Sequence, residues 1–340
     1  MDSLTQAVLG GAVGHAVAGK TLGRRAAAWG AVAGTLPDLD VLTYPFLDTA
    51  GQLLIHRGVT HGLAFGLTVG PILGWLGWRF ARWRTASRSD QSSRAVQAAA
   101  SRAAPDAWRA WVALWTLALV THPLLDTVTI YGTQLLAPFS NEPFALGSLF
   151  IIDPMYTVPL LVGLVVGLVR KRPRWAVVGL ALSTAYVGWS VWAQQTVLDR
   201  ATAALPTSER ILVTPMPLQT LVWRIEAERD GRVTSYRHAI LDPGFFHASD
   251  ASDPLAEFAP DLEDTRGVET LQWFSRGWLV RPRGADSDVV ADARFGRVPG
   301  GNHVFRWEIS PDGSFEQLPF ELSEGSRLFR DLAGDLVSLR

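Results

Sequence analysis

Six side chains that could bind a metal ion lie in the first 126 residues of this chain, in groups flanked by apolar segments. They are Asp38, Asp40, His56, His61, His122 and Asp126. Zinc, magnesium and manganese all accept ligands from this set of imidazoles and carboxylates. Because the chain contains no cysteine, disulfides and thiolate metal sites are excluded. The residue types therefore predict a divalent metal site built from His, Asp and water.

The spacing of these residues restricts how they can meet. Asp38 and Asp40 are alternate residues, which could both reach one cation from an extended turn; the alternative is that they cap a helix end. His56 and His61 are five apart, so they do not share a face of one continuous helix, and Gly58 between them indicates a turn.

His122 and Asp126 are four residues apart, a spacing that places both side chains on one helical face. Pro123 between them removes a backbone donor and can bend the helix. Such a pair can bind one metal, or one member can orient the other. The alternative is a buried hydrogen-bonded pair with a packing role.

The chain divides by composition into two parts. Residues 1–199 contain 15 Lys or Arg and 10 Asp or Glu, whereas residues 200–340 contain 16 and 22. The first part is apolar and the second is ordinarily polar, which predicts a helical membrane domain over 1–195 and a soluble α+β domain over 200–340. Neither part has the concentrated basic patch of a specific nucleic-acid binder.

The apolar runs of the first part predict a mainly α, polytopic helical bundle of about six membrane segments. These segments cover 3–19, 26–36, 62–80, 108–125, 155–169 and 175–193. In the first segment, Gly10 and Gly14 have a spacing that permits close helix approach in a membrane. Residues 84–107, rich in Ser, Ala and Arg, are predicted to form an exposed loop.

Basic residues predict the orientation of these segments, because Lys and Arg favour the cytoplasmic side. The connections 20–25, 79–109 and 170–174 carry 14 basic residues, and the alternating connections 37–60 and 123–153 carry one. The soluble domain is therefore predicted to be extracytoplasmic, on the same side as all six candidate ligands.

Alternating apolar residues in the C-terminal part predict a sheet. The runs 219–226 and 232–241 flank Asp230-Gly231, a strong hairpin signal. Further strands are predicted at 269–281, 287–295, 303–310 and 314–320, and helices at 254–264 and 321–337. The histidines in this part have no catalytic spacing.

Several motifs, in order along the chain, resemble the membrane-bound metal-dependent hydrolases related to the LexA-regulated inner-membrane hydrolases. They are Met1-Asp2-Ser3-Leu4-Thr5-Gln6, Pro37-Asp38-Leu39-Asp40, His56-Arg57-Gly58-Val59-Thr60-His61, His122-Pro123-Leu124-Leu125-Asp126, Tyr131-Gly132-Thr133, Pro138-Phe139-Ser140 and Ile152-Asp153-Pro154. The resemblance covers about residues 1–195. The C-terminal part is similar to the extension of a longer subgroup.

This resemblance implies a helical inner-membrane hydrolase with a divalent metal, zinc in particular. The family is distantly similar to zinc-dependent phospholipase C and to single-strand nucleases, which use a His-x-x-x-Glu or His-x-x-x-Asp pair, matched here by His122 and Asp126. Some members have Thr-His where this chain has Thr5-Gln6, and glutamine is a poor zinc ligand.

Together, the residues and the resemblance predict hydrolysis of a phosphoester, in a lipid or another small molecule, by a metal-activated water at the outer face of the bilayer. Asp38, Asp40 and Asp126 are the predicted catalytic carboxylates. The alternative is a non-catalytic membrane carrier or scaffold, since ionisable groups in membranes also mark ion pathways. Whether His15, Arg57 or Asp153 joins the site is open.

Overall fold

The computed structural model describes residues 1–86, 104–242, 244, 247–263, 265–297 and 303–319. The chain forms two compact units, which we describe separately. The first contains residues 1–42, 56–145 and 151–188, and the second contains 43–55, 146–150 and the chain from 189 onward. All six candidate ligands lie in the first unit.

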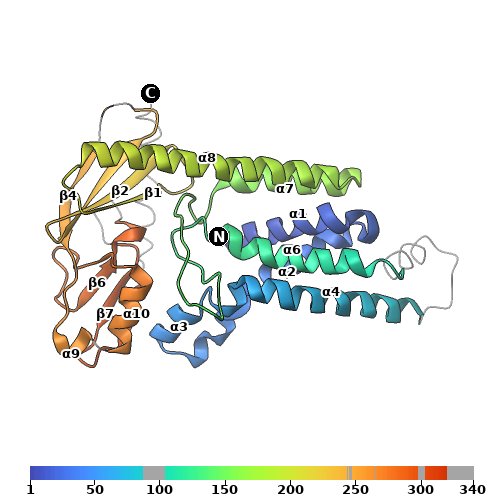
Figure 1. Cartoon of the computed structure of the whole chain (residues 1–340), viewed down its shortest axis with the longest axis horizontal. Coiled ribbons are helices and arrows are strands. Elements are labelled where there is room, and N and C mark those ends of the chain that lie inside the picture. The colour runs from blue at the N-terminus through green and yellow to red at the C-terminus, as the bar shows by residue number, and fades with distance from the viewer. Residues whose placement is uncertain (87–103, 243, 245–246, 264, 298–302, 320–340) are drawn as a thin grey trace. The chain divides into compact units, whose positions relative to one another are not determined.

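The first unit is a bundle of α-helices (Figure 1). Its helices are α1 (Ser3–Leu22), α2 (Arg25–Thr35), α4 (Leu63–Ala86), α6 (Trp108–Asp126), α7 (Pro154–Arg170) and the first part of α8 (Arg174–Ala204). Two short 3-10 segments, η1 (Pro37–Phe46, whose last residues belong to the second unit) and η2 (Val59–His61), interrupt the helical path. Helix α1 contacts α2, α6 and α7, and α4 contacts α6.

Glycines allow α1 and α2 to pack backbone against backbone. A Cβ on Gly10 would lie 2.2 Å from the carbonyl oxygen of Gly30, and one on Gly14 would lie 2.4 Å from that of Ala26. These distances are too short for any side chain, so the close helix approach predicted from Gly10 and Gly14 is confirmed. This close packing holds α2, and the carbonyl groups at its C-terminal end, against α1.

The predicted six-span bundle is wrong. Among the described residues, α8 alone is by itself long and apolar enough to cross a membrane; Thr49–His61 and Leu63–Arg84 pass that test together but are bent by 55° at their junction. Helix α2 has 11 residues, or about 17 Å at 1.5 Å per residue, against a hydrocarbon core of about 30 Å. The apolar runs do form helices, but these helices are short, bent, or lowered in mean hydropathy by small and polar residues.

The second unit contains two four-stranded antiparallel sheets, ordered β1-β2-β3-β4 and β5-β6-β7-β8. The first has β1 (Arg210–Pro215), β2 (Val222–Arg229), β3 (Arg232–Ala239) and β4 (His247–Pro254); the second has β5 (Leu279–Val280), β6 (Val289–Asp292), β7 (Arg306–Ile309) and β8 (Phe315–Gln317). Its helices are α3 (Thr49–Ile55), α9 (Pro260–Glu263), α10 (Arg266–Ser275) and the end of α8, followed by η3 (Ala293–Phe295). Buried Ala193 and Val197 of α8 pack against Trp223 and Ile225 of β2.

The secondary structure predicted for this unit from local sequence patterns is correct in some segments and wrong in others. The β2–β3 hairpin is confirmed, with Asp230 and Gly231 at φ 51° and 66° in its turn. The strand predicted at 269–281 is wrong over most of its length, because α10 buries Val268, Leu271 and Phe274 at helical spacing. The helix predicted at 254–264 is reduced to α9. The helix predicted at 321–337 and most of the loop predicted at 84–107 lie outside the described residues.

Candidate metal centre

Four of the six candidate ligands form one cluster. Asp38, His61, His122 and Asp126 each contribute one ligand atom, and these atoms all lie within 4.8 Å of one another. His61, His122 and Asp126 are buried, and Asp38 is partly exposed. Segments separated by more than 80 residues thus meet in a group whose chemistry suits a divalent cation.

The turn before η2 directs His61 into the cluster. Arg57 has a left-handed backbone at φ 57°, and Gly58 follows as the residue that caps η2. The amide of Arg57 donates to Asp40 at 3.0 Å, and its carbonyl accepts from the amide of Gln134 at 3.0 Å. A left-handed arginine is uncommon and costs about 1 kcal/mol or more, so these bonds hold a conformation that the turn requires.

Both imidazoles present Nε2 to the cluster. His122 Nδ1 donates to the Gly34 carbonyl at the end of α2, at 2.6 Å, and His61 Nδ1 lies 3.1 Å from the hydroxyl of Thr60. The two Nε2 atoms are 3.1 Å apart. With both Nδ1 atoms occupied by local oxygens, each Nε2 is left to bind a proton or a cation.

Two carboxylate oxygens complete the cluster. Asp38 Oδ1 lies 3.5 Å from His61 Nε2 and 3.4 Å from His122 Nε2. Asp126 Oδ2 lies 3.5 Å and 3.3 Å from the same two nitrogens. The four ligand atoms therefore face a common point rather than forming separate pairs.

The two oxygens of Asp126 have different surroundings. Its Oδ1 accepts from the amino group of Met1, from Gln6 Nε2 at 3.1 Å, and lies 3.4 Å from Arg57 Nη2. Its buried Oδ2 has no hydrogen-bond partner among the described residues. It faces His122 Nε2 at 3.3 Å, and a cation at the cluster would replace the His122 proton as the positive partner of this oxygen.

Arg57 supplies a buried positive charge next to the cluster, in addition to its contact with Asp126. Its Nη1 donates to the Thr129 hydroxyl at 3.0 Å, and its guanidinium stacks 4.9 Å from the centre of the Tyr131 ring. The sequence left open whether Arg57 joins the site. In the structure its backbone contacts Asp40 and its guanidinium neutralises Asp126.

The structure does not bring Asp40 and His56 into the cluster. Both aspartates lie in η1, a 3-10 segment in which alternate residues point in different directions, so the expected extended turn is absent. Asp40 instead contacts His56 Nδ1 at 3.2 Å through Oδ1 and lies 3.7 Å from His61 Nδ1 through Oδ2. A carboxylate beside the Nδ1 atom of a histidine can orient that ring so that its Nε2 atom faces a metal ion.

The close spacing of carboxylates and imidazoles in the cluster shifts the pKa values of these groups. Burial raises the pKa of Asp38, but hydrogen bonds from His122 and His61 outweigh burial and hold the pKa of that carboxyl well below its usual range. Burial also lowers the pKa of His122, but Asp126 and Asp38 outweigh it and raise the pKa of His122 to about 9. The cluster therefore attracts positive charge.

The other candidates have separate roles. His15 is buried in α1, near Gly19 and Gly167, away from the cluster. Asp153 caps α7 by accepting from the amides of Met155 and Tyr156. Thr129 and the Gly34 carbonyl contribute to the site but were not predicted, because a hydroxyl in a loop and a backbone oxygen carry no sequence signal.

Comparisons with known proteins agree with a membrane location. Residues 1–197 match the model of a family described as YdjM inner membrane protein. The inner membrane protein YbcI of Escherichia coli (strain K12) is 30% identical over 143 residues, which make up 42% of this chain and 69% of YbcI. No solved structure matches the chain. Since the family match takes in more than half of its residues, the protein belongs to the YdjM inner membrane protein family.

Proposed function

We propose that this protein is a membrane-associated, metal-dependent hydrolase, with zinc held by Asp38, His61, His122 and Asp126. The spacing of the ligand atoms carries the proposal. A tetrahedral zinc with bonds of about 2.0–2.2 Å separates neighbouring ligand atoms by roughly 3.3–3.6 Å. Five of the six separations between the ligand atoms of the cluster range from 3.1 to 3.5 Å.

The chemistry of the donor set supports the same ion. Once His122 releases its proton to allow metal binding, two neutral imidazoles and two carboxylates balance the charge of a divalent cation. Because the four side chains would fill a tetrahedral zinc, a water would have to bind as a fifth ligand, which zinc accepts; the ion would lower the pKa of that water toward about 7 and polarise the scissile group.

Other side chains would complete the reaction. Asp40 holds His56 by its Nδ1 at 3.2 Å, and the His56 side chain is 20% exposed, so this pair is the candidate proton acceptor. Among the predicted catalytic carboxylates, Asp38 and Asp126 would thus bind the metal and Asp40 would act through histidine. Arg57 would keep Asp126 ionised and aligned.

Apolar side chains beside the cluster favour an amphiphilic substrate. Leu39, between the two aspartates, and Val59, in η2, are exposed. Leu136 and Phe139 are also exposed, the latter by 87%, on the loop whose Leu135 carbonyl accepts from the amide of Leu63. We therefore propose a phosphoester with a hydrophobic portion, such as a phospholipid, as the substrate.

The test is hydrolysis by the full chain purified in detergent. After chelation and reloading with zinc, we expect turnover of bis(p-nitrophenyl) phosphate or of phosphatidylglycerol in mixed micelles. His61→Ala and Asp126→Asn should abolish it, with a loss of at least about 10²-fold, because each removes a ligand. Asp106→Asn, an exposed acid elsewhere in the first unit, is the matched control and should retain full turnover.

The same preparations separate this proposal from the carrier alternative. A carrier would show proton-coupled uptake in vesicles and no phosphoester turnover in any metal-loaded sample. Hydrolysis that is unaffected by Asp126→Asn would also contradict the proposal, because the activity would then come from another protein.

A further inference from the structure

Exposed basic side chains concentrate at the end of the first unit that is remote from the metal-binding cluster. Residues 20–25, 79–84, 104–109 and 170–174 contain eleven Lys or Arg, all exposed, and one acidic residue, Asp106. The cluster lies at the other ends of these helices: Gln6 of α1 contacts Asp126, whereas Lys20 lies 14 residues further along the same helix, about 21 Å away.

Contacts between the helices bring these segments to a common end. Arg24 Nε donates to the carbonyl of Leu168 in the last turn of α7, at 3.2 Å. The indole of Trp78 in α4 donates to the carbonyl of Ala104, just before α6, at 3.0 Å. Trp29 of α2 packs 5.9 Å from Trp111 of α6, which joins the two pairs of helices. We call this surface the basic end.

The fold itself does not neutralise this charge. None of the eleven side chains forms an ion pair with a described residue. Helix dipoles explain basic residues at the C-termini of α1, α4 and α7. They do not explain Arg25, Arg109 and Arg174, which lie in the first turns of α2, α6 and α8, where no acidic residue is present. Positive charge at a helix N-terminus is mildly unfavourable, and an anion bound there would offset it.

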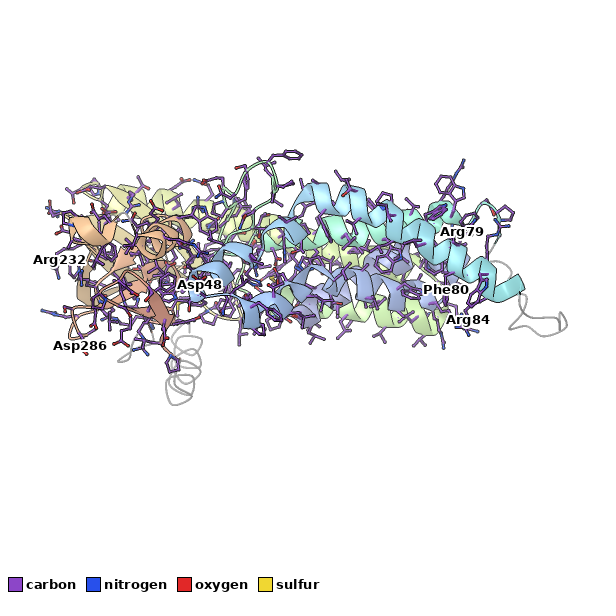
Figure 2. All side chains as sticks on the ribbon, turned by 90° about the horizontal axis from the view of Figure 1, so that it is seen from below. Asp48, Arg79, Phe80, Arg84, Arg232 and Asp286 are labelled. Atoms are coloured by element: carbon purple, nitrogen blue, oxygen red, sulfur yellow. The ribbon has the colours of Figure 1, made fainter. Side chains whose placement is uncertain are left out.

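Aromatic rings accompany the arginines. The guanidinium of Arg79 lies 5.3 Å from the ring centre of Trp75, and that of Arg82 lies 5.0 Å from Trp78. Figure 2 shows Arg79, Phe80 and Arg84 projecting near the end of α4, and Phe80 is 49% exposed. Indole rings and arginines with apolar stems are typical of the level of lipid headgroups.

We infer that the basic end binds the headgroups of anionic phospholipids in the membrane. The positive charge is complementary to anionic headgroups, the exposed rings suit the boundary between headgroups and acyl chains, and the chain belongs to a family of inner membrane proteins. This inference is independent of the metal-binding cluster and of hydrolysis.

The test measures which lipids the full chain retains. The protein is reconstituted in nanodiscs of equal phosphatidylcholine and phosphatidylglycerol, released into mild detergent and examined by native mass spectrometry. We expect wild type to retain phosphatidylglycerol over phosphatidylcholine by about five-fold or more. The triple variant Arg79→Gln, Arg82→Gln and Arg84→Gln should at least halve this preference, whereas the corresponding triple Lys variant should preserve it.

A matched control removes the same charge elsewhere: Arg229→Gln, Arg232→Gln and Arg283→Gln, all exposed in the second unit, should leave the preference at its wild-type value. Circular dichroism checks helix content, and Arg170→Gln with Arg172→Gln and Arg174→Gln replaces the α4 variant if that one unfolds. No preference in wild type, or the same ratio in both triple Gln variants, would overturn the inference. Displacement of the retained lipid by excess glycerol 3-phosphate would also overturn it, since that marks a site for free phosphate.

Discussion

At the scale of single residues, Asp126 connects the metal-binding cluster to the rest of the bundle. One oxygen is surrounded by donors from Met1, Gln6 and Arg57, and the other faces His61 and His122. The donors around the first oxygen keep the buried carboxylate ionised. The resulting negative charge faces the two imidazoles through the second oxygen. The proposed role of Asp126 as a ligand therefore depends on residues outside the four proposed ligands.

Asp40 and Asp38 should differ in how strongly they affect metal binding, although they are two residues apart. Asp40→Asn weakens a contact behind His61 and should lower zinc affinity by about 10–100-fold. Asp38→Asn removes a proposed ligand atom, so its loss should be larger. Competition with a chromogenic chelator measures both affinities. Equal losses, or a larger loss in Asp40→Asn, would contradict the assignment of Asp38 as ligand and Asp40 as support.

Arg57 should contribute to stability as well as to the site. Arg57→Met keeps most of the side-chain volume but leaves Asp126 without its guanidinium, and should lower the free energy of unfolding by about 3 kcal/mol. Arg109→Met, an exposed arginine of α6, should change it by less than about 0.5 kcal/mol. Denaturant unfolding in detergent measures both. Similar values for the two variants would show that Arg57 does not neutralise Asp126.

Sequence spacing identified the residue types of the site but not their roles. The His122–Asp126 pair at four residues could be predicted because a helix fixes its geometry. Which of Asp38 and Asp40 faces the cluster depends on whether the segment is extended or 3-10, and Pro37 permits both. The partners of Arg57 depend on tertiary contacts with Asp126 and Thr129, which no local pattern encodes.

At the scale of helices, the packing of α1 on α2 determines where His122 Nδ1 finds its acceptor, the Gly34 carbonyl. Gly10→Ala would place a methyl group 2.2 Å from the Gly30 carbonyl oxygen, so the helices must separate. We expect destabilisation by about 1–3 kcal/mol and weaker zinc retention. Gly188→Ala in α8, where a Cβ meets nothing within 4 Å, is the control. Thermal unfolding with metal analysis checks both; an unchanged Gly10→Ala protein would contradict this packing.

Strand β2 contains a buried carboxyl that should make stability depend on pH. Burial raises the pKa of Glu226 to about 7, against the partial opposition of Arg224 and the Ser235 hydroxyl. Between its ordinary value of 4.5 and about 7, the folded state retains a proton that the unfolded state releases. Stability of the second unit should therefore fall as pH rises through this window, and remain lower above it.

Glu226→Gln removes this titration, so the variant should gain stability relative to wild type as pH rises from 5 to 8, by roughly 1 kcal/mol or more. Glu308→Gln, at an exposed position in β7, should follow the wild-type pH profile. Melting midpoints at the two pH values measure the difference. If wild type and Glu226→Gln lose stability in parallel, Glu226 does not titrate in this window.

Helices were easier to predict than their function as spans. The apolar runs located α1, α2, α4, α6, α7 and α8, because an apolar run of this length has few alternatives to a helix. The number of spans was wrong because the apolar composition of a run does not show how long or how straight its helix is: α2 has 11 residues, and the pair Thr49–His61 and Leu63–Arg84 is bent by 55°. In α10, apolar residues at helical spacing were mistaken for a strand.

At the scale of the whole molecule, the family match and the apolar helix α8 agree on a membrane protein. The side of the membrane on which the second unit lies stays a prediction from the distribution of basic residues. Within the first unit, the acidic metal-binding cluster and the basic end lie at opposite ends of the same helices. This separation would keep the proposed metal site apart from the proposed lipid-binding surface.

The metal content of the purified protein tests the central claim most directly. We predict about one zinc per chain by inductively coupled plasma mass spectrometry after purification without chelators, with loss of the metal in His61→Ala and His122→Ala. His238→Ala, a buried histidine of the second unit, should retain it. A metal-free wild-type protein, or equal metal in all these variants, would contradict a metal centre formed by Asp38, His61, His122 and Asp126.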